Sequence, residues 1–178
     1  METHLQLGRD KLFVKDSFGE GEFCFSSEVV SVFDDMISRS VPFYPTILSM
    51  ISSMAATYYQ PGTALYDLGC STGNTLVRLV SILKSKCDEM DIVGLDSSQD
   101  MLGVAKDRLK EFSLDEDVRF IKADLNKTVD LKKTSVVILN LVLQFIEKDN
   151  RSALLSSIYA SMASGGCLIL VEKTVPSE

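Results

Sequence analysis

From residue 64 onward, short apolar stretches alternate with segments whose apolar residues recur at helical spacing. The apolar stretches read "ALYDLG", "DIVGLD", "VRFIKAD", "SVVILNLVLQF" and "GGCLILVEK". Between the first two, Leu76, Val80 and Leu83 fall on one face of a helix. Strands that alternate with amphipathic helices form right-handed βαβ units, and the resulting parallel sheet is covered by helices on both faces. The sequence therefore predicts an α/β fold.

The residues before this point do not share the alternation. Residues 1–24 are polar and weakly patterned, as is typical of an arm. Apolar residues then recur at helical spacing in "EVVSVFDDMISRS". A second helix is expected from Pro45, because a missing N–H is tolerated in the first turn of a helix. We therefore expect three parts: an N-terminal arm at 1–24, a pair of helices forming a lid at 25–60, and an α/β domain at 61–178.

The charge of the chain argues against direct contact with nucleic acid. The formal net charge is −7, and the longest basic run is Lys132-Lys133. Proteins that hold nucleic-acid backbones neutralise phosphates with a basic surface. We therefore expect a small-molecule substrate and no direct nucleic-acid partner.

Cysteine usage and hydropathy bear on metals and membranes. The four cysteines are far apart in the sequence and are accompanied by a single histidine, His4, so the sequence predicts no metal site. The N-terminus lacks the pattern of a signal peptide, and no apolar run approaches the ~20 residues that span a bilayer. We expect a soluble cytoplasmic protein without a membrane partner.

The stretch "YDLGCSTGNT", residues 66–75, is typical of a nucleotide-binding turn between a strand and a helix. A dinucleotide site would contain G-x-G-x-x-G, but this turn has only Gly69 and Gly73, and Ser71 stands in place of the middle glycine. A phosphate loop would need G-x-x-x-x-G-K-[ST], and no lysine lies near the turn. Neither phosphate-binding interpretation therefore fits.

Asp67 favours a cationic ligand at the same turn. It lies two residues before Gly69, where a pyrophosphate would be repelled and an ammonium or sulfonium group attracted. The amino-acid end of S-adenosyl-L-methionine has this charge, and its carboxylate can use backbone N–H groups at the start of the following helix. A D-x-G sequence also occurs as a plain turn between strand and helix, so this signal needs support from other residues.

Polar residues also end the next three predicted strands. Asp96 is placed to accept hydrogen bonds from both ribose hydroxyls, although it is equally suited to cap the helix that begins near Ser98. Asp124 is placed to accept from the adenine amino group, with the Leu125 N–H directed at a ring nitrogen. Asn140 is an amide in an apolar run, and a buried amide needs partners. Four successive polar strand ends resemble the class I S-adenosylmethionine-dependent methyltransferase fold.

Longer stretches narrow this resemblance. "VFDDMISRSVPFY", "QPGTALYDLGCSTG", "VVILNLVLQFIE" and "GGCLILVEK" resemble the carboxy-S-adenosyl-L-methionine synthase family over roughly residues 25 to 175. The resemblance implies a Rossmann-like methyltransferase fold with sheet order 3-2-1-4-5 and an N-terminal helical lid. It also implies a transferase that converts S-adenosylmethionine and prephenate to carboxy-S-adenosylmethionine and phenylpyruvate, for modification of the tRNA wobble uridine. A homodimer is implied as well.

The resemblance also assigns residues to the site. By matching position, the family's ligand contacts fall on Tyr44, Gly69, Cys70, Ser71, Asp96, Ser97, Asp124, Leu125 and Asn140, and the charge of Asp67 adds that residue to the set. Arg39 lies in the matched "SRSVPFY" element, where it could pair with a substrate carboxylate. The favoured alternative for Arg39 is a cation at the C-terminal end of a helix. No residue is assigned a catalytic role.

The chain departs from the family pattern in several places. Phe43 stands where the family tends to have glycine, and Asp34 stands where it tends to have proline. The turn reads Ser71-Thr72-Gly73-Asn74 where the family usually has Ser-Leu-Gly-Ala. We expect these departures to affect fine specificity and not cofactor binding.

The last residues, "VEKTVPSE", come before the sixth and seventh strands and the carboxylate-binding arginine that the resemblance implies. The fifth strand is therefore expected to have an exposed apolar edge. We expect a chain that keeps the cofactor site, and we leave turnover open. Two other functions stay open: an ordinary small-molecule methyltransferase, and a catalytically silent module that binds an adenosyl ligand. A nicotinamide dehydrogenase is a weaker third, because the middle glycine is missing.

Overall fold

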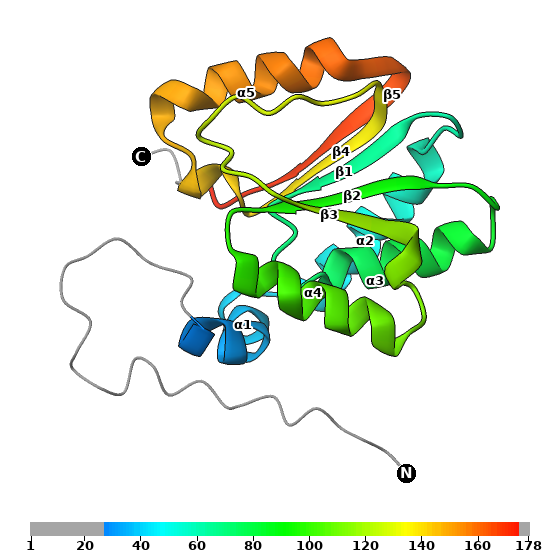
Figure 1. Cartoon of the computed structure of the whole chain (residues 1–178). Helices are drawn as coiled ribbons and strands as arrows, with labels where there is room; N and C mark the ends of the chain where they lie inside the picture. The colour runs from blue at the N-terminus through cyan, green and yellow to red at the C-terminus, as the bar shows by residue number, and fades with distance from the viewer. Residues whose placement is uncertain (1–26, 175–178) are drawn as a thin grey trace.

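A five-stranded parallel sheet forms the centre of the computed structural model, which describes residues 27–174 (Figure 1). The strands are β1 (Ala64–Leu68), β2 (Asp91–Asp96), β3 (Val118–Lys122), β4 (Thr134–Asn140) and β5 (Met162–Val171). Their order is β3-β2-β1-β4-β5, and every neighbouring pair is parallel. The predicted α/β class and the order implied by the resemblance are confirmed. The predicted N-terminal arm lies outside the described residues.

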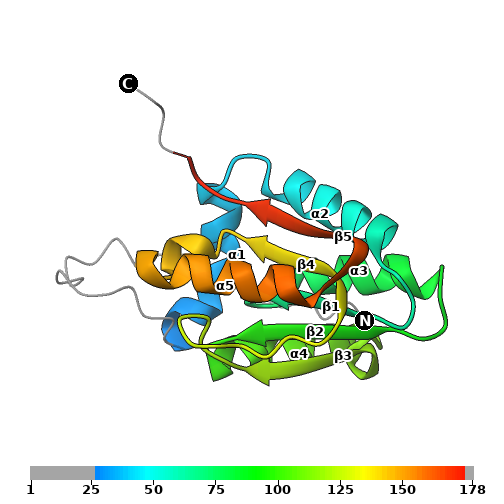
Figure 2. The same cartoon turned by 90° about the horizontal axis from the view of Figure 1, so that it is seen from above.

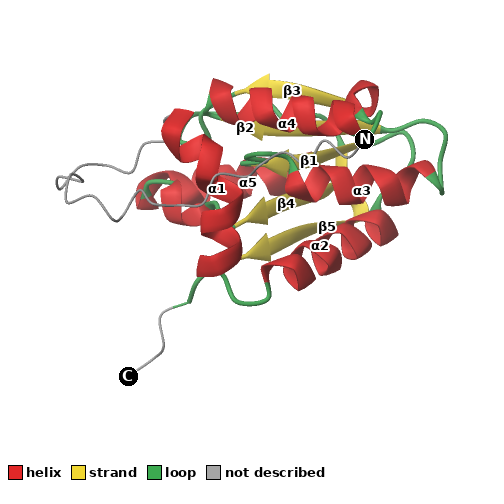
Figure 3. Ribbon diagram, turned by 90° about the horizontal axis from the view of Figure 1, so that it is seen from below, coloured by secondary structure: helices red, strands yellow, loops and turns green. Residues whose placement is uncertain are grey.

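Helices cover both faces of the sheet. On one face lie α2 (Tyr44–Tyr58), α3 (Asn74–Lys84) and α4 (Gln99–Glu111), as Figure 3 shows. On the other face lies α5 (Lys148–Ser161), which is seen above the strands in Figure 2. Short 3-10 turns occur at Asp115–Asp117 and Leu143–Phe145.

Side chains of the central strands alternate between two apolar cores. In β1, Leu65 belongs to the core shared with α2, α3 and α4, whereas Tyr66 and Leu68 belong to the core shared with α5. Each fully buried aliphatic side chain of this kind contributes roughly 1.5–3 kcal/mol to folding. The double core therefore holds the carboxyl ends of β1, β2 and β4 in fixed positions relative to one another.

The two N-terminal helices differ in what they cover. α2 packs on the sheet and buries Leu48, Ile51 and Ala55. α1 (Ser27–Ser40) lies instead beside the carboxyl ends of the strands and against α4 (Figures 1 and 3). Its apolar cluster is small, with Val30 and Phe33 buried against Met101 of α4. Of the predicted lid, α1 is thus the part that faces the strand ends.

Phe43, in the connection between α1 and α2, has a left-handed backbone conformation with φ 58° and an 81% exposed side chain. This conformation costs a non-glycine residue roughly 1–2 kcal/mol. We therefore expect Phe43→Gly to raise the free energy of unfolding by about 0.5–1 kcal/mol, once the greater chain entropy of glycine is subtracted. Urea unfolding measures the change. The control Phe43→Ala keeps the backbone strain and should give no gain, and a glycine variant no more stable than the alanine variant would contradict the explanation.

β5 is an edge strand that pairs, within the described residues, with β4 alone. Its Leu170 side chain is 46% exposed. This agrees with the expected exposed apolar edge. Across residues 27–174, none of the helices combines the length and the apolar character that crossing a membrane requires.

Candidate functional site

A cavity of about 400 Å³ lies at the carboxyl ends of the strands, between them and α1. Asp96 and Asn140, the last residues of β2 and β4, line it together with Asp67 of β1. α1 contributes Phe33 and Ile37. All ten residues predicted to contact the cofactor line this cavity: Tyr44, Asp67, Gly69, Cys70, Ser71, Asp96, Ser97, Asp124, Leu125 and Asn140.

The turn between β1 and α3 requires glycine at two positions. Gly69 has φ 79°, and a Cβ added there would lie 2.5 Å from the Val142 side chain. Gly73 has φ 78°, and a Cβ there would lie 3.1 Å from the Cβ of Ala105. Glycine adopts this backbone conformation without a steric penalty. The turn therefore packs closely between α4 and the loop that follows β4.

Backbone hydrogen bonds hold the same turn against the end of β2. The Gly69 and Cys70 N–H groups both donate to the Leu95 carbonyl oxygen, at 2.7 and 2.9 Å. The Ser71 N–H donates to Asp96 Oδ2 at 2.9 Å. These three N–H groups are therefore already used within the chain. A ligand that contacts Gly69, Cys70 or Ser71 must use their carbonyl oxygens or side chains instead.

Asp67 is a buried carboxyl group with an oxygen that has no hydrogen-bond partner. Asp67 is only 2% exposed, and its Oδ2 has no hydrogen-bond partner. Burial and, secondarily, the nearby Asp96 carboxylate raise the pKa of Asp67 from 3.8 to about 7. A buried unpaired acceptor is costly unless a ligand or water satisfies it. Asp67 is therefore suited to a donor, and above all to a cation.

Asn140, which lines the same cavity, has a second unsatisfied oxygen. It ends β4, the strand that pairs with β1, and its Oδ1 is buried without a partner. Neighbouring parallel strands place Asp67 and Asn140 at the same edge of the sheet. Two buried acceptors without donors fit a ligand that supplies N–H groups or a positive charge, as the amino-acid end of S-adenosylmethionine does.

Asp96 lines the cavity, and its carboxylate also accepts hydrogen bonds from the turn after β1 and from the start of α4. Its two carboxylate oxygens accept from the Ser71 and Ser98 N–H groups, each at 2.9 Å. The cap of α4 is Ser98, whose Oγ accepts from the Met101 N–H at 3.3 Å. Burial raises the pKa of Asp96, while the N–H donors of Ser98, Ser71 and Ser97 oppose this rise. Each carboxylate oxygen retains a second acceptor site for a ligand hydroxyl.

Asp124 lies two residues beyond the end of β3, which finishes at Lys122, so it belongs to the loop and not to the strand. Its Oδ1 accepts from the Asn126 N–H at 2.9 Å, which forms a local turn. Leu125 beside it is buried at the cavity wall. The pair thus offers an acceptor and an apolar surface on one side of the cavity.

Tyr44 and Cys70 are the remaining predicted contacts with strongly altered acidity. Burial, reinforced by the carboxylates of Asp34 and Asp67, raises the pKa of Tyr44 to about 12. Burial also raises the pKa of Cys70 well above that of an exposed thiol. Both groups therefore stay protonated near neutral pH. The Cys70 thiol lacks the thiolate character that a nucleophile needs.

Arg39 does not line the cavity. Its Nε lies 3.2 Å from Asp35 Oδ2 in the last turn of α1, which is the alternative role expected for it. Lys173, which follows β5, was missed by the sequence reasoning and is the cation among the described cavity-lining residues. No motif marked it, because only the fold brings the end of β5 to this edge.

The loop after β4 forms another part of the wall that the sequence did not reveal. Leu141, Val142 and Phe145 line the cavity. The Leu143 N–H donates to Glu172 Oε1 at 2.6 Å, which ties this loop to the residue after β5. Within residues 27–174, no group of three or more histidine, cysteine or acidic side chains is arranged to hold a metal ion.

A family described as "Methyltransferase domain" matches residues 65–166, which include the sheet from β1 to the start of β5. This match covers more than half of the chain and agrees with the strand order. It does not by itself distinguish one reaction from another, because a fold hosts many activities.

Curated proteins named carboxy-S-adenosyl-L-methionine synthase are similar to the chain over nearly its whole length. The protein from Hydrogenovibrio crunogenus is 40% identical over 171 residues, which cover 96% of this chain and 66% of that protein. The protein from Methylococcus capsulatus is 36% identical over 169 residues, which cover 95% and 69%. The chain belongs to the carboxy-S-adenosyl-L-methionine synthase family. It spans about two thirds of the length of these synthases.

Solved structures share the fold of this synthase-family chain at low sequence identity. A structure described as a putative S-adenosylmethionine-dependent methyltransferase from Methanococcus maripaludis has a TM-score of 0.62 and 18% identity, and the match covers 85% of this chain and 65% of that one. The glycopeptide N-methyltransferase MtfA, complexed with S-adenosylmethionine, has a TM-score of 0.55 and 15% identity, with 67% and 48% covered. These likenesses confirm the predicted fold, as the curated relatives confirm the predicted family.

Proposed function

We propose that the chain binds S-adenosyl-L-methionine in this cavity and acts as a carboxy-S-adenosyl-L-methionine synthase. The overall reaction converts S-adenosylmethionine and prephenate to carboxy-S-adenosylmethionine, phenylpyruvate and water. The observation that carries the proposal is the pair of buried oxygens without partners, Asp67 Oδ2 and Asn140 Oδ1, on two residues that line the cavity at the strand ends. Because the chain belongs to the synthase family, we infer that the ligand of this pair is S-adenosylmethionine.

Five of the ten predicted contacts are assigned to parts of the cofactor in this proposal. Asp67 and Asn140 hold the ammonium of the amino-acid end, because they offer buried acceptors and one negative charge. Asp96 accepts from the ribose hydroxyls. Asp124 and Leu125 contact the adenine, the first through its carboxylate and the second through its backbone N–H.

The cavity also suits a reaction that must be kept dry. Bound S-adenosylmethionine supplies a methyl carbon activated by the adjacent sulfonium, and this is the carbon that gains the carboxyl group. Met36, Val41 and Phe145 line the cavity and give it an apolar wall, which suits a reaction that water would disturb. The Tyr44 phenol stays protonated near neutral pH, so it can donate a hydrogen bond but is not suited to act as a base. We assign no residue the role of catalytic base.

Lys173 is proposed to attract a carboxylate of prephenate. A lysine ammonium pairs with a carboxylate as a point charge. The other charged side chains that line the cavity are the carboxylates of Asp67, Asp96 and Asp124. We expect Lys173→Met to raise the KM for prephenate about tenfold, with the Kd for S-adenosylmethionine unchanged. Steady-state kinetics and calorimetry measure the two constants. Lys148→Met removes a lysine outside the cavity lining and serves as control. Equal KM values for the two variants would remove Lys173 from this role.

The proposal also covers the use of the product, the location of the protein and its oligomeric state. The product would pass to a separate enzyme that modifies the tRNA wobble uridine, so this acidic chain need not bind RNA. We propose a cytoplasmic homodimer, as the family resemblance implies. Sedimentation velocity measures the association. A chain that stays monomeric at high micromolar concentration would remove the dimer from the proposal.

The test of the activity is incubation of the purified chain with S-adenosylmethionine, with and without prephenate, followed by mass spectrometry of the nucleoside products. We expect a nucleoside heavier by one carboxyl group, together with phenylpyruvate, only when prephenate is present. Methylation of an added acceptor without prephenate would support an ordinary methyltransferase. Binding of S-adenosylmethionine without any product would support a silent adenosyl-binding module. Asp96→Ala is the matched control for background chemistry.

A further inference from the structure

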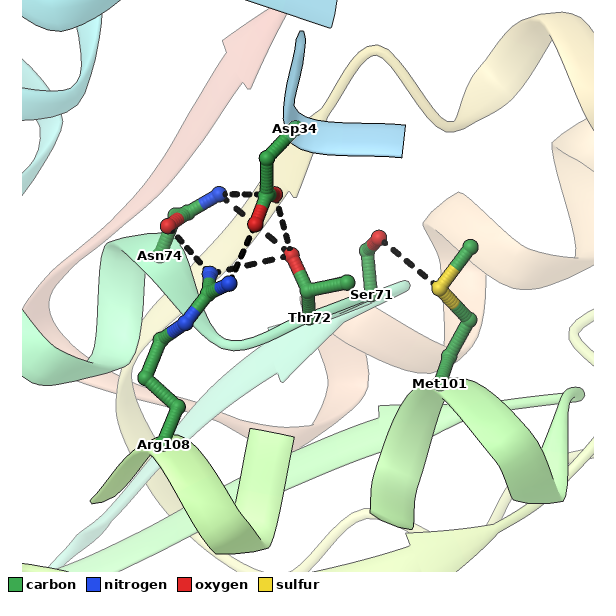
Figure 4. A network of polar contacts seen from close by, with 6 residues as sticks. All are labelled: Asp34, Ser71, Thr72, Asn74, Met101 and Arg108. Atoms are coloured by element: carbon green, nitrogen blue, oxygen red, sulfur yellow. Dashed lines mark hydrogen bonds and ion pairs between the residues drawn. The ribbon is translucent and has the colours of Figure 1, made fainter. Parts of the chain in front are cut away.

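A polar cluster joins α1 to the turn after β1 and to α4 (Figure 4). Asp34 of α1 forms an ion pair with Arg108 of α4. The Thr72 hydroxyl and the Asn74 Nδ2 both donate to Asp34 Oδ1, at 2.7 Å each. Arg108 also donates to Thr72 Oγ1 at 3.2 Å and to Asn74 Oδ1. We call these four residues the α1 clamp.

The α1 clamp is shielded from solvent, so its bonds are worth more than surface contacts. The Arg108 and Asp34 side chains are only 19% and 14% exposed, and Thr72 is 1% exposed. A guanidinium with its fixed set of donors can bind Asp34, Thr72 and Asn74 together, which a single point charge cannot do. Removal of one charged partner leaves the other poorly solvated and costs more than a surface ion pair would.

The α1 clamp includes part of the cavity wall. Thr72 and Asn74 line the cavity themselves, and Asp34 follows Phe33, which also lines it. The Asn74 side chain also interacts with the Tyr44 phenol, whose pKa it lowers against the larger effect of burial. The clamp therefore joins three parts of the wall that come from α1, the turn after β1 and the start of α2.

Polar contacts supplement the apolar attachment of α1. Among the side chains that the structure describes, Val30 and Phe33 of α1 are buried with Met101, three partly buried apolar side chains pack against them, and this cluster is separate from the two cores of the sheet. Because the cluster is smaller than either core, we expect α1 to open more readily than the sheet. The ion pair with Arg108 adds a second attachment of α1 beside the cavity.

We propose that Asp34 and Arg108 are positioning residues that preorganise the cavity for its adenosyl ligand. They hold α1 against the turn after β1, so that Phe33, Tyr44 and Ser71 already face the ligand before it binds. A wall ordered in advance lowers the entropy cost of binding. This inference rests on the proposed function for the identity of the ligand. Neither residue touches the reacting atoms, so the expected effect falls on affinity.

The test measures the Kd for S-adenosylmethionine by calorimetry in the wild type, Arg108→Gln, Asp34→Asn and the double variant. We expect each single variant to weaken binding about tenfold. The double variant should weaken binding by no more than one single variant, because both changes break the same bond. Arg119→Gln is the matched control, since it breaks the exposed ion pair of Arg119 with Asp91 at the other end of the sheet. It should leave the Kd unchanged.

Hydrogen exchange separates positioning from stability alone. In the ligand-free chain, α1 amides should exchange faster in Arg108→Gln than in the wild type, while β1 and β4 amides stay protected. Arg108→Lys, which keeps the charge and loses the fork of donors, should fall between the two in both exchange and Kd, and it substitutes if Arg108→Gln does not fold. Variants that unfold more easily yet bind with the wild-type Kd would overturn the inference and leave the proposed function standing. A wild type that binds no S-adenosylmethionine would overturn both.

Discussion

At about pH 8, replacing Asp67 with asparagine should weaken S-adenosylmethionine binding about a hundredfold, because a charge-assisted bond to a cation is lost. Asp67 is buried, lines the cavity and has an oxygen without a partner, so the ligand ammonium is the group that would satisfy it. The asparagine is nearly the same size and keeps an acceptor. The loss would therefore report charge and not shape.

The binding of the cation should also depend on pH. Burial and the Asp96 carboxylate raise the pKa of Asp67 to about 7 in the ligand-free chain. A cationic ligand favours the ionised carboxylate, so binding below this pKa must release a proton. The wild-type affinity should fall by up to about tenfold per unit as the pH drops below about 7, while Asp67→Asn should show little change. Calorimetry in two buffers with different ionisation enthalpies measures the Kd and the released protons. A wild-type Kd that is constant across this range would contradict the role of Asp67.

Without ligand, the same group should affect stability in the opposite direction. The folded-state pKa of Asp67 lies above the ordinary value of 3.8, so the folded chain holds a proton that the unfolded chain has lost between these values. This contribution to the free energy of unfolding is fully present below the ordinary value and is lost as the pH rises through about 7. Urea unfolding at several pH values, compared with Asp67→Asn, isolates it.

Asp96→Ala should weaken S-adenosylmethionine binding by about a hundredfold or more, because the two proposed ribose contacts are lost together with the hydrogen bonds that hold the turn after β1. In the folded chain the Asp96 carboxylate accepts from the Ser71 and Ser98 N–H groups, which fixes the turn after β1 against the start of α4. The variant leaves both donors without their acceptor. Calorimetric titration measures the Kd.

A pair of controls distinguishes ribose recognition from loss of structure in the Asp96 variant. Ser98→Ala removes the cap of α4 and should cost about 1 kcal/mol of stability, with the Kd unchanged. Adenosine and its 2′,3′-dideoxy analogue supply the second control. The wild type should prefer adenosine, and Asp96→Ala should bind both weakly and alike. If the variant keeps the wild-type preference for the hydroxyls, Asp96 does not read the ribose.

Most of the fold and of the candidate site could be predicted from the sequence, chiefly from residue patterns in the strands and at their ends. Alternating apolar stretches predicted the sheet, because a strand buried on both faces must be continuously apolar. Asp67, Asp96 and Asn140 could be placed at one edge, since the carboxyl ends of parallel strands meet there. The structure brings them to one cavity together with Tyr44, which the resemblance and not the pattern had supplied.

The features that could not be predicted from the sequence depend on contacts between distant segments of the chain. Asp34 and Arg108 are 74 residues apart, and nothing in either local pattern marks them as partners. The departures at Asp34, Thr72 and Asn74 read as separate substitutions, yet in the fold they share one hydrogen-bonded cluster. Lys173 reaches the cavity only because β5 lies beside β4. Such placements follow from packing, which a linear pattern does not encode.

The central claim, that this cavity is an S-adenosylmethionine site, is tested most directly by native mass spectrometry of the purified chain. The sample is measured as isolated and after addition of S-adenosylmethionine, NAD or ATP. We predict one equivalent of S-adenosylmethionine or its carboxylated derivative, lost in Asp67→Asn and Asp96→Ala and retained in Arg119→Gln. Binding of NAD or ATP as tightly as S-adenosylmethionine, or an adenosyl complex that survives both cavity substitutions, would contradict the claim.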